Sequence, residues 1–400
     1  MLEIELAEPF LPILLAEGHG GAHVLVRLKG RPVGRIWISR SKDGSFVEAD
    51  VLKRKIASNI SDTAAQALFS SIEKESGPAP MPDLTIAICT RNRAPLLGRC
   101  LKAILQLVGG LDTVSVLVVD NAPSDPSTEE LVRSFESVRY VLEPVPGLDF
   151  GRNRAISHSA TKWLAFVDDD AVVDRGWLAS LAEGIAQSPD AGAFTGPILP
   201  LVLDTEARLR FELAGGFGKG FTWQRFSSQR SGDAIHPANA GDFGTGASMA
   251  LSTAALGELK GFDEALDTGP PLAGGGDLDI FYRLLRSGKR VVYLPGLVVH
   301  HEHRADMVGL RRQYFSWGLT ITALMQKNMV SDPAMRPAHI RMLQSWLRSK
   351  LRELARACVG AGPRKPHLVL AELHGAVVGY FGEYERSQLR VEERKRKHAL

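Results

Sequence analysis

From Asp83 onward the sequence alternates short apolar runs with longer amphipathic stretches, and this alternation limits the fold more than any other feature. After the first run, Leu97, Leu101 and Leu105 recur every four residues, as on one face of a helix. Strands that alternate with helices of this length indicate βαβ units and a mostly parallel sheet with helices on both faces. The expected strands span residues 84–89, 114–119, 138–142 and 163–167.

Polar residues directly follow three of these expected strands. Their carboxyl ends are where open parallel sheets bind ligands. A single acidic residue after a strand often only caps the next helix. Three polar strand ends in one sheet instead indicate a binding site along that edge. The three groups are Thr90-Arg91-Asn92-Arg93, Asp120-Asn121 and Asp168-Asp169-Asp170.

The acidic triplet Asp168-Asp169-Asp170 is the strongest single feature of the sequence. Adjacent carboxylates repel one another, so a fold that gathers them usually holds a cation there. Oxygen ligands favour Mg²⁺ or Mn²⁺, and Mg²⁺ is typically shared between one or two carboxylates and the phosphates of a substrate. We therefore expect Mg²⁺ or Mn²⁺ as the cofactor and a diphosphate on the substrate. The alternative is a solvated acidic turn.

Seven segments between Leu84 and Arg304 form an ordered series of motifs. They read TIAICTRNRAPLLGRCL, VLVVDNAPSD, PGLDFGRNRAI, WLAFVDDDAVV, FGTGASMALS, GGGDLDIFYRLLRSGKRVVYLP and VVHHEHR. Each is weak alone, but in this order they resemble the family 2 glycosyltransferases, an inverting class that uses nucleotide sugars. The resemblance implies the GT-A fold, an α/β, Rossmann-like architecture. It does not extend with comparable specificity to the two ends of the chain.

The resemblance assigns the nucleotide-sugar donor to residues at the strand ends. It implies that Asp120 binds the base or ribose and that Asp168, the first residue of the DxD pair, faces the ribose. The full set expected to bind the donor is Thr90, Arg91, Arg93, Asp120, Asn153, Arg154, Asp168 and Asp169.

The same resemblance implies a metal site made of the last carboxylate of the triplet and a late histidine. Asp170 takes the first place, and His301 is the best match for the second. His303 lies two residues away and remains the alternative. A structural role for either histidine is also open, because a lone histidine at a strand end is more often a hydrogen-bonded structural residue than a metal ligand.

The acceptor side shows one departure from the family pattern. Where the family has a Glu-Asp pair, this sequence has Gly276 before Asp277. Asp277 keeps the position of the catalytic base. For Asp279 we favour a structural interpretation, a favourable charge near the start of a helix. Residues 244–249 resemble the acceptor-side segment, although a tight turn before a strand also explains their glycines.

These assignments predict a transferase that moves a sugar from a UDP-, GDP- or dTDP-linked donor to a hydroxyl on a carbohydrate, a lipid-linked molecule or another acceptor. A metal would stabilise the leaving diphosphate while Asp277 takes the acceptor proton. Two alternatives stay open. One is a metal-dependent nucleotidyltransferase, although residues 90–93 lack the glycines of its phosphate loop. The other is a non-catalytic sugar-nucleotide binder, if Gly276 signals lost activity.

The first 80 residues form a separate unit by their pattern. Two β-rich runs, 23–28 and 33–39, flank a turn at 29–32 and predict a hairpin, and a helical stretch follows. A Gly- and Pro-rich segment at 77–82 then marks a boundary. We expect a small α+β domain at 1–80, a GT-A domain at 81–304 and a helical region at 305–400.

The carboxyl-terminal region is expected to form helices at 309–329, 338–359 and 367–386. The second is basic and amphipathic, so it either lies on an anionic membrane surface or is an ordinary packed helix with a solvated face. The formal net charge of the chain is only +3 and is concentrated in its last residues, which argues against nucleic acid as a partner. Without an apolar span or a basic leader, we expect a cytoplasmic protein, with peripheral contact at the inner face of the membrane as the alternative.

Overall fold

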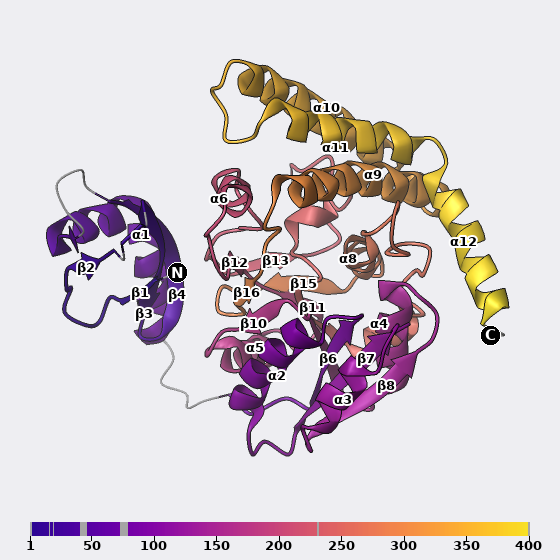
Figure 1. Cartoon of the computed structure of the whole chain (residues 1–400), viewed down its shortest axis with the longest axis horizontal. Coiled ribbons are helices and arrows are strands. Elements are labelled where there is room, and N and C mark those ends of the chain that lie inside the picture. The colour runs from indigo at the N-terminus through magenta and orange to yellow at the C-terminus, as the bar shows by residue number, and fades with distance from the viewer. Residues whose placement is uncertain are drawn as a thin grey trace.

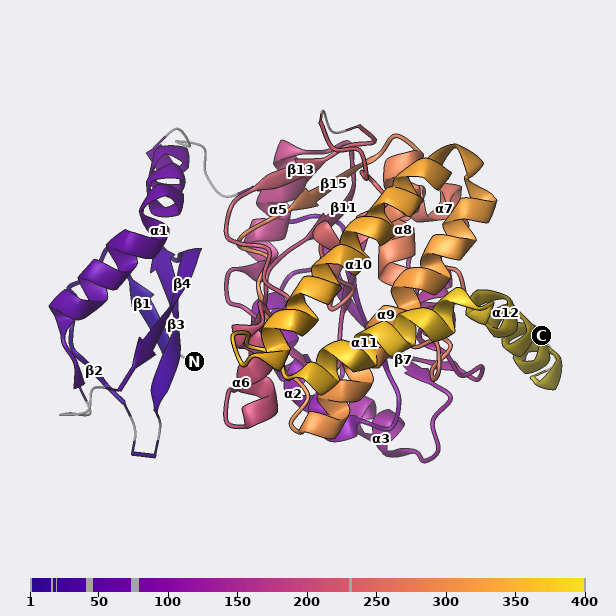
Figure 2. The same ribbon diagram turned by 90° about the horizontal axis from the view of Figure 1, so that it is seen from above.

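We describe a computed structural model of the chain, in which residues 2–15, 17–18, 20–40, 46–72, 79–229 and 232–398 are described. Three parts follow one another along the chain (Figure 1). An N-terminal module, residues 2–72, lies beside a central α/β body, and helices from the end of the chain lie across that body. Figure 2 shows the same arrangement from above.

The N-terminal module is built on the predicted hairpin, which is confirmed. Its strands β3 (Gly21–Leu28) and β4 (Arg31–Ser39) pair antiparallel around Lys29-Gly30, whose φ angles of 51° and 77° suit a two-residue hairpin turn. Helix α1 (Ala49–Ile72) packs on this sheet over a core that includes Val24 and Leu52. The remaining strands are β1 (Leu2–Glu5), β2 (Ile13–Leu14) and β5 (Phe46–Val47). Of the expected boundary at 77–82, residues 77 and 78 lie outside the described part of the chain.

The central body contains an eight-stranded sheet in the order β13-β15-β11-β14-β9-β6-β7-β8. All four strands predicted from sequence are present, and β9, β6, β7 and β8 run parallel to one another. The sheet is mixed because β14 runs antiparallel to both β9 and β11. Its strands are β6 (Leu84–Thr90), β7 (Val114–Asn121), β8 (Val138–Glu143), β9 (Trp163–Val167), β11 (Ala191–Thr195), β13 (Gln224–Phe226), β14 (Ser248–Ser252) and β15 (Arg290–Tyr293).

Helices cover both faces of the sheet, as the apolar runs require. Alternate strand residues enter two different cores: Ile86 and Ile88 face α2 and α5, whereas Ala87 faces α4, α7 and α8. The expected α/β architecture, with a mostly parallel sheet and helices on both sides, is confirmed. The helices of the body are α2 (Ala94–Val108), α3 (Ser127–Arg133), α4 (Leu148–Ser157), α5 (Trp177–Gln187), α6 (Glu206–Leu213), α7 (Thr253–Glu258) and α8 (Gly276–Arg286), with a short 3-10 turn at Ala240–Asp242.

A second, small sheet lies next to the acidic triplet. It has the order β10-β16-β12, formed by Ala171–Val173, Val299–His301 and Ile198–Pro200. The antiparallel register sets Ala171 opposite His301. The last residue of β16 is therefore held beside the residue that follows Asp170.

The carboxyl-terminal region is helical, as predicted, with one difference. The segment expected as one helix at 367–386 is two helices, α11 (Pro366–Tyr380) and α12 (Glu383–Lys397). The helix is interrupted at Gly382, whose φ of 76° lies in the left-handed region. The others are α9 (Met307–Ser331), a 3-10 turn (Pro333–Met335) and α10 (Arg336–Cys358). Among the described residues, no helix has both the length and the apolar character needed to cross a membrane.

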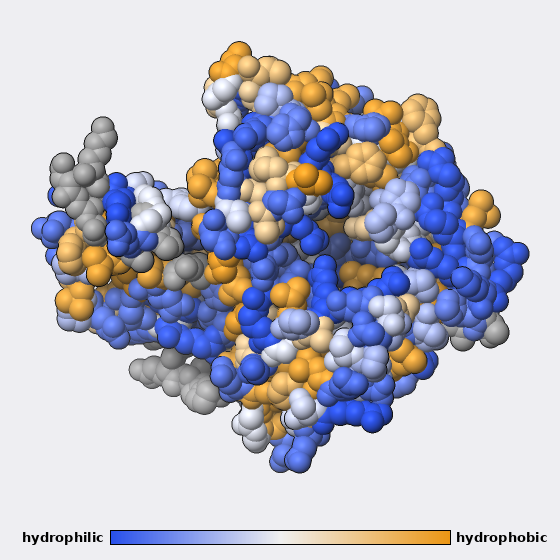
Figure 3. Space-filling model, viewed as in Figure 1, coloured by the Kyte–Doolittle hydropathy of each residue, from blue (hydrophilic) through white to orange (hydrophobic). Residues whose placement is uncertain are grey.

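The helices α9 and α11 pack unusually closely. A β-carbon at Gly318 would lie 1.8 Å from the carbonyl oxygen of Glu372, and one at Gly375 would lie 1.9 Å from that of Phe315. Only glycine allows the two backbones to approach this far. The outer faces of α10 and α11 expose apolar side chains, which Figure 3 shows at the top of the view. They include Leu347, Leu351, Leu370 and Val377.

Candidate active site

The acidic triplet lies where β9 ends and β10 begins, and the end of β6 holds its middle residue. Thr90 donates a hydrogen bond from Oγ1 to Asp169 Oδ2 at 2.7 Å, and Arg93 Nη1 donates to Asp169 Oδ1 at 2.9 Å. The same nitrogen of Arg93 lies 3.2 Å from Asp170 Oδ2. Asp169 is therefore tied to the neighbouring strand end through both of its carboxylate oxygens.

His301 completes this group through the register of the small sheet. Its Nε2 lies 3.1 Å from Oδ1 of Asp170. Possible ligand atoms of Asp168, Asp170 and His301 all lie within 4.8 Å of one another. His303, the alternative in the sequence, instead places its Nε2 2.8 Å from Oε1 of Glu212.

The electrostatics of this group suit a cation. Burial and the neighbouring carboxylate of Asp170 raise the pKa of Asp168. For Asp170, burial alone would raise the pKa, but the hydrogen bond and charge of His301, with Arg93, hold it below its usual value. Oδ1 of Asp170 is buried and faces Nε2 of His301 at 3.1 Å. Two carboxylates and an imidazole fit Mg²⁺ or Mn²⁺.

Asp120 lies at the end of β7, fully buried. Its Oδ2 accepts a hydrogen bond from the Tyr140 hydroxyl at 3.1 Å, whereas Oδ1 is buried without a partner among the described residues. Burial raises its pKa, although the Tyr140 bond opposes this. A buried oxygen with an unused lone pair is suited to accept a hydrogen bond from a ligand. Arg91, which follows the neighbouring strand β6, is exposed.

The structure does not bring Asn153 and Arg154 to the acidic triplet. Asn153 donates from Nδ2 to the carbonyl oxygen of Phe262 at 3.0 Å and accepts the backbone N–H of Phe262 at Oδ1 at 2.8 Å. These bonds fix α4 to the loop after α7. Arg154 is on the exposed side of α4. The buried arginine of this motif is Arg152, one residue before Asn153 and two before Arg154, which the sequence analysis did not single out.

Arg152 is the centre of a second charged cluster. Its Nη1 lies 2.8 Å from Asp149 Oδ1 and 3.3 Å from Asp267 Oδ2. Burial raises the pKa of both carboxyls, and the charge of Arg152 only partly opposes this. The three-residue spacing of Asp149 and Arg152 on a helix is a sequence signal for such a pair. Asp267 is distant in sequence, so no local pattern could have revealed it.

Asp277 is the second residue of α8, and its charge acts on Arg152 and Asp267 of this cluster. Its Oδ2 accepts the backbone N–H of Gly246 at 2.6 Å, and its Oδ1 accepts that of Leu278 at 2.8 Å. Ala247, which follows Gly246 in the chain, accepts a hydrogen bond from the backbone N–H of Asp168 at 3.3 Å. Two consecutive residues of the 244–249 segment therefore join Asp277 to the acidic triplet.

Asp279 lies in the first turn of α8, where we expected a favourable charge, but its partners give it a further structural role that the sequence did not indicate. It is fully buried, its Oδ2 lies 2.6 Å from Arg283 Nε, and its Oδ1 forms a close ion pair with Lys327 of α9. It holds the carboxyl-terminal helices on the body.

The central part of the chain is similar in sequence to known glycosyltransferases. Residues 85–248 match the model of Glycosyl transferase family 2. The chain is 27% identical over 259 residues to pre-mycofactocin glycosyltransferase of Mycobacterium tuberculosis H37Rv, covering 63% of this chain and 50% of that protein. It is 28% identical over 247 residues to succinoglycan biosynthesis protein ExoM of Rhizobium meliloti, covering 59% of this chain and 73% of the relative.

The chain thus spans about half the length of the mycobacterial relative. Among solved structures, it is similar to the mannosyltransferase PcManGT from Pyrobaculum calidifontis in complex with GDP-Man and Mn²⁺. That match has a TM-score of 0.48 and 19% identity, and it covers 82% of this chain and 90% of the other. The match of residues 85–248 to the family model, together with the glycosyltransferase relatives, supports a family 2 glycosyltransferase.

Proposed function

We propose that this protein transfers a sugar from a nucleoside-diphosphate sugar to an acceptor hydroxyl with inversion at the anomeric carbon. One observation carries the proposal. Asp168, Asp170 and His301 meet at the end of β9, and consecutive residues of the 244–249 segment bond Asp277, through Gly246, and the backbone of Asp168, through Ala247. A cation site next to a carboxylate is what transfer from a diphosphate donor requires.

Asp170 and His301, with Asp168 beside them, are the residues that would hold Mg²⁺ or Mn²⁺. Such a cation neutralises the charge that develops on a departing diphosphate. Arg93 supports this arrangement, since it donates to both Asp169 and Asp170 and so keeps the two carboxylates in place. The unpaired oxygen of Asp120 supports a contact with the ribose or base.

Asp277 is our proposed general base. The backbone amides of Gly246 and Leu278 hold one carboxylate oxygen each, so the group is fixed in direction while it keeps lone pairs to accept a proton. Deprotonation of the acceptor hydroxyl as it attacks from the face opposite the diphosphate inverts the configuration. No covalent sugar–enzyme intermediate is needed.

Incubation with UDP-, GDP- and dTDP-linked sugars that carry a label on the sugar tests this proposal. A transferase is expected to release labelled sugar slowly to water when no acceptor is present, from one of the donors. A non-catalytic binder would retain the intact donor. A nucleotidyltransferase would instead exchange label between a sugar phosphate and a nucleoside triphosphate. Absence of hydrolysis and of transfer with all three donors would contradict the proposal.

The acceptor class is a hydroxyl on a carbohydrate, a lipid-linked molecule or another compound, and nucleic acid is not a proposed partner. We also propose peripheral contact of a cytoplasmic protein with the inner face of the membrane. The support is a face of α10 on which exposed Leu347 and Leu351 alternate with exposed Arg348 and Arg352. In the basic tail, Arg394 instead donates to the backbone carbonyls of Pro146 and Thr268 in the body, at 2.7 and 2.6 Å.

A further inference from the structure

The N-terminal module and the body enclose two cavities between them. In Figure 2, β3 and β4 form the side of the module that faces the body. Arg27 of β3 pairs with Asp174 at 2.5 Å, and Arg35 of β4 pairs with Glu212 at 2.7 Å. Because Arg27 and Asp174 are both buried, this is a packed interface, and residues of the module are part of the cavity walls.

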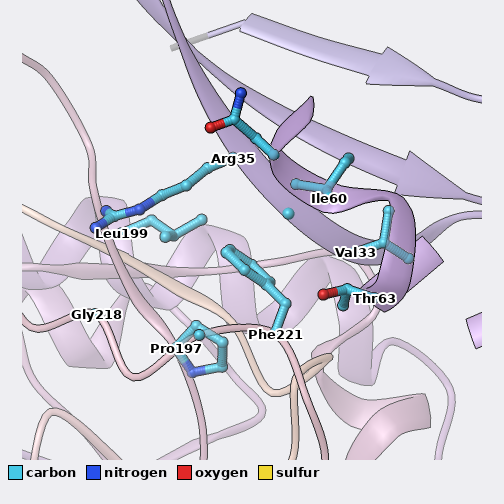
Figure 4. A pocket seen from close by; sticks show the side chains of 11 residues that line it. Val33, Arg35, Ile60, Thr63, Pro197, Leu199, Gly218 and Phe221 are labelled. Carbon is cyan, nitrogen blue, oxygen red and sulfur yellow. The ribbon is translucent and has the colours of Figure 1, made fainter. Parts of the chain in front are cut away.

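The smaller cavity has a volume of about 270 Å³ and adjoins the strand of His301. One of its lining residues, Leu199, pairs in the small sheet with His300, the residue before His301. Both parts of the chain line this cavity, and Figure 4 shows Arg35, Ile60 and Thr63 of the module across from Leu199 and Phe221 of the body.

The larger cavity, which we call the interface cleft, has a volume of about 760 Å³. This volume is in the range of sites that bind small molecules. Its walls include the hairpin turn 29–32 of the module, residues of α5, and Phe221, Thr222, Trp223 and Arg225 of the body. Thr63 and Phe221 line both cavities, so the two adjoin.

One glycine-rich segment of the body connects the candidate metal site with the interface cleft. At its start, the ring of Phe217 lies with its centroid 5.8 Å from that of His301. Gly218 and Gly220 then line the smaller cavity, and Trp223 lines the cleft. A chain molecule that lies along this segment therefore extends from the cleft towards His301.

Positive charge predominates in the interface cleft. Its ionisable residues are four cations and one carboxylate, namely Lys29, Arg31, Arg175, Arg225 and Glu183. Arg31 and Arg175 each have a carboxylate partner at 3.2 Å. Lys29 of the module and Arg225 of the body form no ion pair among the described residues. Charges of one sign along a cleft raise the local concentration of oppositely charged ligands, so this cleft favours an anion.

The uncharged lining combines aromatic rings with amide and hydroxyl side chains. Arg225 lies over the ring of Trp223, with its guanidinium carbon 5.4 Å from the centroid, so a charge and an aromatic surface lie together. The amide and hydroxyl side chains are those of Thr63, Gln66, Ser180, Gln187 and Thr222. They both donate and accept hydrogen bonds, as sugar hydroxyls do, and the C–H faces of sugar rings pack against aromatic rings. Together with the positive charge, this lining suits a carbohydrate that carries acidic groups.

We propose that the interface cleft binds an acidic oligosaccharide, which is the part of a long acceptor that lies away from the reacting hydroxyl. The proposal rests on the function proposed above, in which carbohydrates are one of the acceptor classes. It gives the N-terminal module a role in the reaction. Lys29 and Arg225 bind the acidic groups from opposite walls, and the segment that begins at Phe217 directs the chain towards His301.

Binding of a galacturonic acid tetrasaccharide to the full chain in EDTA tests this proposal without donor, metal or turnover. Isothermal titration calorimetry should show saturable binding that weakens as salt is added. The neutral tetrasaccharide maltotetraose should bind more weakly. No binding of the acidic tetrasaccharide, or equal affinity for the two, would overturn the proposal. Inorganic sulfate that binds as tightly as the acidic tetrasaccharide would also overturn it, since the cleft would then recognise only an anion.

The double variant Lys29→Gln/Arg225→Gln removes the two cations that have no ion-pair partner. Affinity for the acidic tetrasaccharide should fall about 10-fold, because two exposed charge contacts are lost. The matched control Arg54→Gln/Lys102→Gln removes two exposed cations that do not line the cleft, and it should keep the native affinity. Equal losses in the two double variants would attribute binding to the overall charge and overturn the proposal.

A second variant blocks the cleft without changing its charge. Ala179 is exposed on α5 and lines the cleft, so Ala179→Trp should fill part of it and weaken binding of the acidic tetrasaccharide. Ala355→Trp, at an exposed position of α10, is the control and should bind normally. Thermal unfolding followed by circular dichroism checks that both variants are folded. Native affinity in folded Ala179→Trp would overturn the proposal.

These measurements separate failure of this proposal from failure of the proposed function. If the native protein hydrolyses a labelled donor but does not bind the acidic tetrasaccharide, the cleft proposal fails and the proposed function stands. If the protein binds the tetrasaccharide through Lys29 and Arg225 but neither hydrolyses nor transfers any donor sugar, the proposed function fails and the cleft remains an oligosaccharide site.

Discussion

Gly276 lies directly against the carboxylate of Asp149. A β-carbon at Gly276 would be 2.0 Å from Oδ2 of Asp149, so no side chain fits there while Asp149 stays in place. The sequence shows a glycine where the family has a glutamate, and the structure shows a carboxylate from α4 in the adjoining space. The contact with Asp149 therefore explains why glycine occupies position 276, and the explanation does not require a loss of activity.

We predict that Gly276→Glu displaces Asp149 from Arg152 and destabilises the protein by at least about 2 kcal/mol, because it overpacks the site and breaks a buried pair. Asp149→Ala combined with Gly276→Glu should recover part of this loss, since the new carboxylate then takes the vacated space. Unfolding in urea measures both. If the double variant is no more stable than Gly276→Glu, a carboxylate at position 276 does not replace that of Asp149.

Asp277→Asn should lower the rate of sugar transfer by about 10²–10⁴-fold, because an amide cannot accept the acceptor proton. Binding of the nucleoside diphosphate should change little, and calorimetry measures it separately from turnover. The exposed Asp112→Asn serves as the control. Asp279→Asn is unsuitable as one, since it leaves Lys327 and Arg283 without their buried partner. Full transfer activity in Asp277→Asn would place the base elsewhere.

Removal of divalent metal should weaken donor binding. With Asp168, Asp170 and His301 as the proposed site, calorimetric titration with UDP and GDP should show tighter binding with Mn²⁺ than with EDTA. Asp170→Asn should lose most of this difference. Equal affinity of the native protein in Mn²⁺ and in EDTA would contradict a metal-assisted donor site.

Two buried histidines should make the fold sensitive to acid. His23 and His339 have no hydrogen-bond partner on either ring nitrogen among the described residues, and burial lowers the pKa of each to about 4. Between that value and the ordinary pKa of about 6.5, the unfolded chain binds protons that the folded chain does not. The free energy of unfolding should therefore fall as pH drops through this window. The double variant His23→Phe/His339→Phe should lose less of its free energy of unfolding over this pH range than the native protein does. The control His398→Phe, at an exposed position, should show the native pH dependence.

Vesicle co-sedimentation tests the proposed membrane contact. Anionic vesicles should retain the protein at low salt and release it at high salt, since each basic residue near the surface contributes about 1 kcal/mol. Leu347→Ser with Leu351→Ser should weaken retention, because these exposed side chains supply the apolar part of the α10 face. Absence of binding at both salt concentrations would remove the membrane contact from the proposal.

The sequence alone determined the features that depend on local order. Apolar runs ending in polar residues predicted β6, β7 and β9 and placed Thr90, Asp120 and the acidic triplet at one edge of a sheet. Parallel strands bring their carboxyl ends together, so this followed from periodicity. The hairpin of the N-terminal module was equally local, since a turn with positive φ angles joins its strands.

Tertiary structure decided which side chains meet. Spacing could not choose between His301 and His303, because both lie near the end of one strand. The pairing of β10 with β16 directs His301 to Asp170, while Glu212 of α6 draws His303 away. The contact of Arg152 with Asp267, which is distant in sequence, was equally invisible. Such contacts join residues far apart in the chain, and only packing of the whole fold sets their distances.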